Sequence, residues 1–104
     1  MGKNNTSLTI IAKVLPDGLP FIARGRDAWA LMQLYRAGAA GCTPIDTPGP
    51  RWSGYVHKLR KKGLHIETVH EEHGGQFAGR HARYVLQSNV SLVVKDEDDT
   101  KEAA

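Results

Sequence analysis

Long hydrophobic runs are missing from this chain of 104 residues. A helix that crosses a membrane needs about 20 consecutive apolar residues, and no stretch here approaches that length. Nor does a basic start precede a short apolar core, as it does in a secretory signal peptide. We therefore expect a soluble cytoplasmic protein with no membrane partner.

Cysteine is almost absent too, since Cys42 is the only one. A single thiol cannot form an internal disulfide, which is consistent with a reducing compartment. His70, His73 and His81 have spacings that could converge on a hairpin, but no cysteine or carboxylate arrangement completes a tetrahedral metal site. We predict solvated histidines there, with no metal and no other cofactor.

Signatures of catalysis are also missing. The sequence has no glycine-rich phosphate loop before a helix, no nucleophile-elbow pattern and no paired carboxylates beside a base. We therefore predict that the protein is not an enzyme. The length fits one domain, whose modest core suffices without disulfides or metals.

Acidic charge is scarce outside one end of the chain. Of the 14 basic and 11 acidic residues, two basic and five acidic ones lie in 95–104, so the remainder has 12 basic against 6 acidic residues. A basic body with a short acidic tail favours a nucleic-acid partner. The alternative is that surface charge serves solubility alone.

The segment 51–63, RWSGYVHKLRKKG, contains no acid and is the most informative part of the chain. Because residues advance about 100° each along a helix, this segment has a polar, basic face and an apolar one. The apolar residues recur at the spacing of one buried helix face, namely Trp52, Tyr55, Val56 and Leu59. A helix that packs through one face and presents cations on the other suits the major groove of DNA.

The N-terminal part of the chain predicts two strands and a helix. Leu8–Val14 and Leu19–Ala23 have strand composition and flank a turn at 16–18, so we expect a hairpin. Asp27–Ala37 repeats apolar residues at helical spacing, with Asp27 as N-cap and Gly38 as a natural stop.

The C-terminal part predicts a second hairpin. Leu64–Glu71 and Arg80–Leu86 alternate like strands and are joined by a glycine-rich loop. Val90–Val94 is a candidate last strand, and the acidic residues after it have the composition of a disordered tail. We expect an N-terminal extension over 1–24, a domain over 25–94 and the tail over 95–104.

The region 28–86 resembles a known family. Its segments AGAAGCTPID, GYVHKLRKKGLHIETV and RYVL are similar to those of small winged helix-turn-helix proteins of bacteria, phages and prophages. The run 59–68, LRKKGLHIET, is the most specific part. The resemblance implies an α+β fold with a three-helix core and the C-terminal hairpin as a wing. Pro44, Pro48 and Pro50 depart from the pattern, because they leave little room for a regular second helix.

The resemblance and the basic helix together predict double-stranded DNA as the partner. The helix over 51–62 would enter the major groove while the wing holds the backbone. Most cations would meet phosphates, whereas Arg51 at the helix start is placed to bond a guanine. The alternative is a solvated lysine-rich face. The predicted contacts are Arg51, Ser53, Gly54, His57, Lys58, Lys61 and Lys62 on the helix, and Arg80 and Arg83 at the wing.

Two features of this surface have more than one interpretation. Gly54 costs the helix up to about 1 kcal/mol relative to alanine, so it either permits close approach of a ligand or packs against the preceding helix. Aromatic residues could stack on bases, but their spacing favours the core. These are Trp29, Tyr35, Trp52, Tyr55 and Tyr84.

Two functions compete on the sequence alone. The leading one is a DNA-binding transcriptional regulator, or an accessory factor of a phage or mobile element. The second is a protein-interaction module, because winged helices also bind proteins. In that case the apolar hairpin over 8–23 would pair with a partner's sheet or with a second copy, giving a homodimer.

Overall fold

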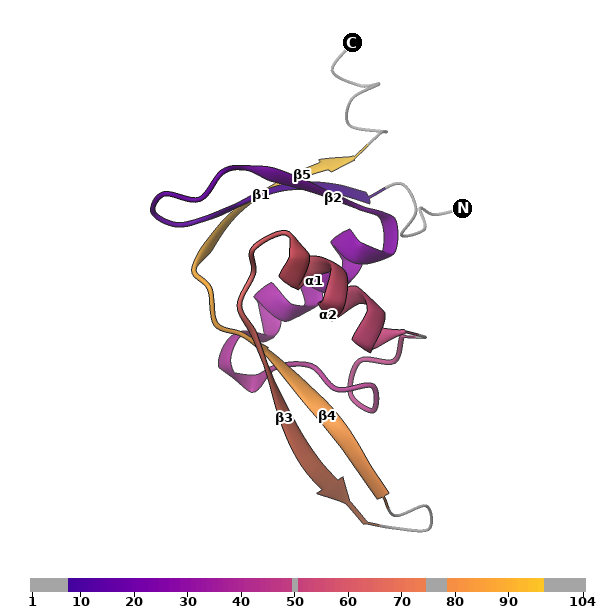
Figure 1. Cartoon of the computed structure of the whole chain (residues 1–104). Helices are drawn as coiled ribbons and strands as arrows, with labels where there is room; N and C mark the ends of the chain where they lie inside the picture. Colours follow the sequence, from indigo (N-terminus) through magenta and orange to yellow (C-terminus); the bar gives the residue numbers. More distant parts are fainter. Residues whose placement is uncertain (1–7, 50, 75–78, 97–104) are drawn as a thin grey trace.

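A pair of packed helices lies between a three-stranded antiparallel sheet and the base of a two-stranded one in the computed structural model, which describes residues 8–49, 51–74 and 79–96 (Figure 1). In chain order the elements are β1 (Leu8–Val14), β2 (Phe21–Arg24), α1 (Gly25–Ala37), the 3-10 turn η2 (Gly38–Ala40), α2 (Trp52–Lys61), β3 (Ile66–His73), β4 (Gly79–Leu86) and β5 (Val90–Asp96). Within the described ranges, no helix has the length and apolar character that crossing a membrane requires.

The predicted N-terminal hairpin is confirmed, and it belongs to a three-stranded sheet. β1 lies in the middle, between β2 and β5. Ile10 pairs with Ala23 on one side and with Val94 on the other. Strand alternation turns Ile10 and Ala12 toward the helices, where both are buried. The predicted division of the chain at residues 24 and 94 stays a prediction, and residues 97–104 of the predicted tail lie outside the described residues.

Helix α1 begins earlier than the sequence predicts. Arg24, not Asp27, occupies the N-cap position, and Asp27 lies in the first helical turn. The helix ends at Gly38, as expected, whose φ of 57° suits glycine. The prediction that Tyr35 faces the core is wrong. The buried face is centred on Leu31 and Leu34, which leaves Tyr35 49% exposed.

The expected three-helix core is wrong, because the described residues contain only two α-helices. Where a second helix was expected, Thr43 starts a single turn. Its buried hydroxyl accepts the N–H groups of Ile45 and Asp46 at 3.2 and 2.9 Å. Pro48 has no N–H to donate to the carbonyl oxygen of Pro44, so the turn is not extended. Among the described residues that follow, none is helical before Trp52.

A glycine in an unusual conformation ties this segment to the second sheet. Cys42 forms a two-residue bridge with Tyr84 of β4. Gly41, just before it, has a φ of 71°, and a Cβ there would lie 2.6 Å from the carbonyl oxygen of Tyr84. Only glycine fits both the dihedral angle and the space. This accounts for the second glycine of the segment AGAAGCT.

Helix α2 is confirmed where the sequence predicts it. Its four stripe residues are buried: Trp52, Tyr55, Val56 and Leu59. Trp52 is the centre of an aromatic cluster, with ring centroids 5.4 Å from Trp29, 6.1 Å from Tyr55 and 6.1 Å from Tyr84. Its indole N–H donates to the carbonyl oxygen of Thr47 at 2.7 Å. Tight aromatic packing at its first turn therefore fixes where α2 starts.

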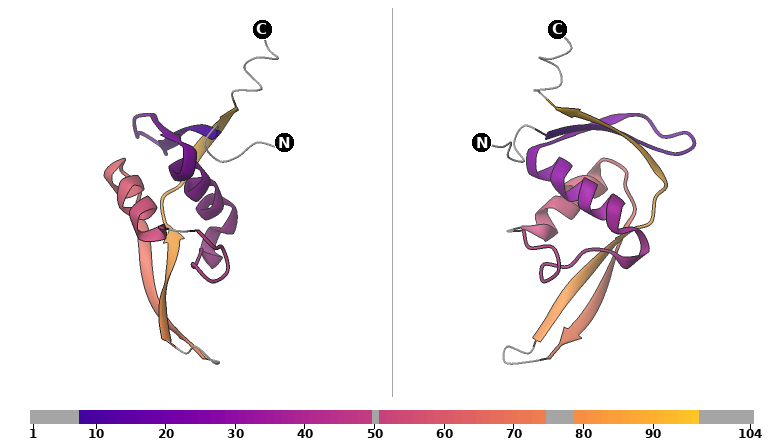
Figure 2. Two further views of the ribbon diagram at one scale, coloured as in Figure 1. Left: turned by 90° about the vertical axis from the view of Figure 1, so that its right-hand side faces the viewer. Right: turned by 180° about the vertical axis from the view of Figure 1, so that it is seen from behind.

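The hairpin of β3 and β4 extends away from the helices, at the opposite end of the molecule from the three-stranded sheet (Figure 2). Ile66 and Tyr84 are buried near its base. Along β4, exposure changes from buried Tyr84 through partly buried residues to exposed Arg80, and the tip over 75–78, which includes Phe77, lies outside the described residues. Among the described residues, the expected wing is attached to the rest of the protein through its base.

Candidate nucleic-acid interface

The face of α2 that points away from the core is polar and open. Ser53, His57 and Lys61 are exposed on it, and Gly54 is half-buried. Outside the helix backbone, the nearest atom that a Cβ on Gly54 would meet is the Cβ of Arg51 at 3.9 Å, an ordinary contact. Since no other element of the described residues packs against Gly54, the interpretation that this glycine accommodates a neighbouring helix is wrong.

The cations of α2 and its ends are exposed, namely Arg51, Lys58, Arg60, Lys61 and Lys62. Lys58 lies 4.0 Å from a carboxylate oxygen of Asp27, and its side chain is still 66% exposed. Among the described residues, no carboxylate lies within ion-pair distance of Arg51, Lys61 or Lys62. The acids of the described residues therefore leave most of this positive charge uncompensated.

Arg60 differs from the other cations because it is tied to β3. Its guanidinium donates two hydrogen bonds to the carbonyl oxygen of Ile66, and one at 2.8 Å to the hydroxyl of Thr68. The loop between α2 and β3 turns at Gly63, whose φ is 108°. The run 59–68 thus holds α2 against β3 of the wing. This role of Arg60 was not predicted from the sequence.

The two predicted wing cations are in different environments. Arg80 lies at the start of β4, far from the helices, where it pairs with Glu72 at 3.7 Å and both side chains are more than three-quarters exposed. Arg83 lies at the base of the wing and points inward, with 28% of its side chain exposed. The two arginines therefore do not lie together in one site.

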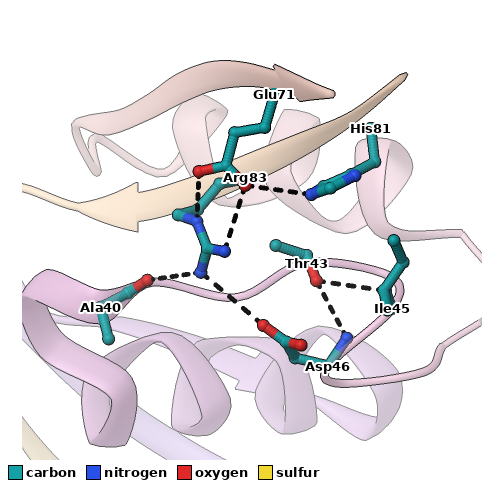
Figure 3. A network of polar contacts seen from close by, with 7 residues as sticks. All are labelled: Ala40, Thr43, Ile45, Asp46, Glu71, His81 and Arg83. Carbon is teal, nitrogen blue, oxygen red and sulfur yellow. Dashed lines mark hydrogen bonds and ion pairs between the residues drawn. The ribbon is translucent and has the colours of Figure 1, made fainter. Parts of the chain in front are cut away.

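Arg83 is the centre of a polar network that Figure 3 shows. It donates to both carboxylate oxygens of Glu71 at 2.6 and 3.1 Å and to the carbonyl oxygen of Ala40 at 2.8 Å, and it lies 3.7 Å from a carboxylate oxygen of Asp46. His81 contacts the same Glu71 carboxylate at 3.0 Å. The network joins the wing to the segment that replaces the missing helix.

The electrostatics of this network follow from its geometry. The Arg83 guanidinium, more than the His81 ring, holds the pKa of the Glu71 carboxyl below its usual range against a smaller opposing effect of burial. Glu71 in turn raises the pKa of Arg83. Arg83 and Glu71 are diagonal neighbours across the two strands, so the charge pattern of the predicted hairpin contained a usable signal.

The histidines and the cysteine form no further site in the described part of the chain. His70 is exposed on β3, and no group of three histidine, cysteine, aspartate or glutamate residues there is arranged to hold a metal ion. Burial raises the pKa of the Cys42 thiol, which disfavours its reactive thiolate form. The candidate site is therefore the cationic surface of α2 together with the wing.

Comparison with known proteins gives one match. A family model described as a winged helix domain covers residues 20–96 of the chain. No curated protein and no solved structure matches this chain.

Proposed function

Because this chain belongs to the winged helix domain family, we propose that it binds double-stranded DNA with α2 in the major groove. The wing lies along the backbone, Arg51 reaches a base edge at the start of the helix, and the protein acts without catalysis. We further propose a cytoplasmic role in transcription regulation, or as an accessory factor of a phage or mobile element.

One observation carries the proposal. α2 buries its whole apolar stripe, and the residues opposite are small, polar or basic. No acid occurs in 51–63. A helix about 10–12 Å across fits the major groove, which is about 12 Å wide. Its exposed lysines then meet phosphates, while Ser53, Gly54 and His57 lie nearest the bases.

Fluorescence anisotropy with a duplex of about 20 base pairs, two turns of B-DNA, tests the proposal. Four to six phosphate contacts predict a slope of roughly −4 to −5 for log K against log salt concentration. Lys61→Gln removes one contact, which lowers the size of the slope by about 0.9. Arg36→Gln is the matched control, because Arg36 is an exposed arginine at the far end of α1.

Two results would reject DNA binding. One is the absence of a complex with wild-type protein at low salt. The other is a complex whose affinity does not depend on salt concentration, since a phosphate-bound interface must release counterions.

The outer face of the three-stranded sheet favours a second candidate function, protein binding. Ile11 pairs with Ile22 on one side and with Val93 on the other, so the three form a row across the sheet. Ile22 and Val93 are 42% and 53% exposed. The helices lie on the opposite face (Figure 2). A partner's apolar surface, or a second copy of the chain in a homodimer, fits this row.

A further inference from the structure

The two sides of α2 differ in charge, and the difference concerns how DNA is held. A helix that fills the major groove has a phosphate backbone on each side. One side of α2 faces β3 through Arg60. The other side faces the end of β2 and the start of α1, through Lys58 and Lys62.

On the wing side, the described cations are engaged by the protein. Arg60 is bound to β3, Arg83 is held by Glu71 and Asp46, and Arg80 is paired with Glu72. The wing strands also contain Glu67, which accepts a hydrogen bond from Gln87. Arg80 and Arg83, the arginines of the described wing, each have an acidic neighbour, whereas Arg60 of α2 is held by uncharged oxygen atoms and keeps its charge. The wing strands themselves therefore offer a DNA strand little net attraction.

On the opposite side lies a pocket of about 210 Å³, which we name the flank pocket. Its inner wall includes the buried side chains of Ala23 and Leu59. Its rim holds three cations and one carboxylate. The lining residues are Ile22, Ala23, Arg24, Asp27, Lys58, Leu59 and Lys62.

The charges of the flank pocket are poorly compensated. The one acid, Asp27, is 4.0 Å from the Lys58 nitrogen, a long ion pair. Arg24 and Lys62 are exposed, and no carboxylate of the described residues lies within ion-pair distance of either. Three cations against one acid leave a net positive pocket beside the proposed groove-binding helix, where a backbone phosphate would pass.

Building on the proposed function, we propose that the flank pocket binds backbone phosphates of the DNA strand on that side. It is the main contact between the protein and the DNA backbone. Arg24, which the sequence analysis did not single out, is a phosphate contact together with Lys58 and Lys62. Asp27 restrains binding, because its carboxylate competes with phosphate for Lys58. The wing contributes less than the flank pocket.

The test compares four variants with wild-type protein by anisotropy over a salt series. Arg24→Gln with Lys62→Gln removes two contacts, so the salt slope should fall in size by about two, whereas Arg80→Gln should change it little. At about 0.1 M salt each lost contact weakens binding roughly eightfold if counterion release carries it. Asp27→Asn should tighten binding severalfold, and Arg36→Gln is the control for the loss of one positive charge away from the pocket.

The outcomes separate this inference from the proposed function. Suppose that wild-type protein binds DNA and that Lys61→Gln lowers the affinity. If the double variant of Arg24 and Lys62 then has the same affinity and salt slope as Arg36→Gln, the flank pocket is not a DNA contact. A larger loss of DNA affinity in Arg80→Gln than in the double variant would show that the main contact with the DNA backbone is on the wing. Circular dichroism spectra confirm folding of each variant. An unchanged affinity in Asp27→Asn would overturn the restraint by Asp27.

Discussion

A basic side chain that looks free in the sequence can be committed to the fold. Arg60 and Arg83 each carry the same charge as the lysines of α2, but their guanidinium groups hold backbone carbonyls and a carboxylate. A planar guanidinium with several donors can bridge such acceptors, whereas a lysine ammonium is a mobile point charge. This explains why Arg60 and Arg83 connect separate elements, whereas the lysines of α2 remain on its exposed face.

Replacing Arg83 tests the joint at the wing base. Arg83→Gln should lower the free energy of unfolding at pH 7, because it breaks the contacts with Glu71, Asp46 and Ala40. The pKa of Glu71 is lowered in the folded protein. The ionised carboxylate therefore contributes to stability above the ordinary glutamate pKa of about 4.3, and this contribution is lost as pH falls through the pKa of Glu71 in the folded protein.

Urea unfolding of both proteins at neutral and acidic pH checks this prediction. The stability difference should be largest near neutral pH and shrink in acid, leaving the part due to the Ala40 carbonyl, which does not titrate. Arg80→Gln is the control and should change little, since its ion pair is exposed. A difference that is independent of pH would show that Glu71 is not the important partner.

Among the elements, α2 combines a rigid inner face with an outer face that the protein leaves open. Gly54 lies on that outer face, where a Cβ would meet nothing closer than 3.9 Å. The fold therefore has no steric need for glycine here, and glycine weakens a helix. Close approach of the DNA backbone or a base is the interpretation that remains.

Gly54→Ala should separate stability from binding. We expect the variant to be more stable by about 0.5–1 kcal/mol, from the difference in helix propensity. It should also bind duplex DNA more weakly, because the added methyl group lies between the helix and the groove. Thermal melting and anisotropy measure the two effects. Binding that is unchanged while stability rises would remove Gly54 from the interface.

Sequence periodicity predicted the elements that have a regular local pattern. The stripe of Trp52, Tyr55, Val56 and Leu59 located α2. Strand composition around a turn located the first hairpin, and strand alternation located the second. The segment over 41–51 was harder to predict. The family resemblance implied a helix there, whereas the prolines of the segment disfavour one. What replaces the helix is the Cys42 bridge, the Thr43 turn and the Arg83 network. Those are long-range contacts, which no local pattern encodes.

The site was predictable to a similar degree. The sequence identified the exposed cations of α2, since helical spacing alone decides which side of a helix faces outward. It did not identify Arg24, because Arg24 approaches Lys58 and Lys62 only once β2 packs beside α2. A cluster drawn from three separate elements has no signal along the chain.

At the scale of the whole molecule, the N-terminal hairpin is part of the core. Ile10, Ala12 and Ala23 are all at most 3% exposed and pack with the helices. Truncating one large core side chain costs about 2–5 kcal/mol, and a domain is stable by only about 5–15 kcal/mol. Removing the hairpin therefore removes stability, along with any partner surface it carries.

We expect a chain lacking residues 1–24 to lose cooperative unfolding, as measured by circular dichroism during urea titration. Ile22→Lys is the matched variant, because it alters the exposed row of the outer face and leaves the core side chains in place. Light scattering on this variant then tests self-association. A dimer that Ile22→Lys converts to monomer supports pairing through this face, and a monomer in both proteins excludes it.

The pairing of β1 with β5 has a consequence for synthesis. Leu8 is opposite Asp96, so the middle strand of the sheet gains its second neighbour only from the last described residues. During translation, the ribosome releases β1 long before β5 exists. The apolar side chains of β1 therefore stay unpaired on this side until β5 has been synthesised, and completion of the sheet depends on this distant contact.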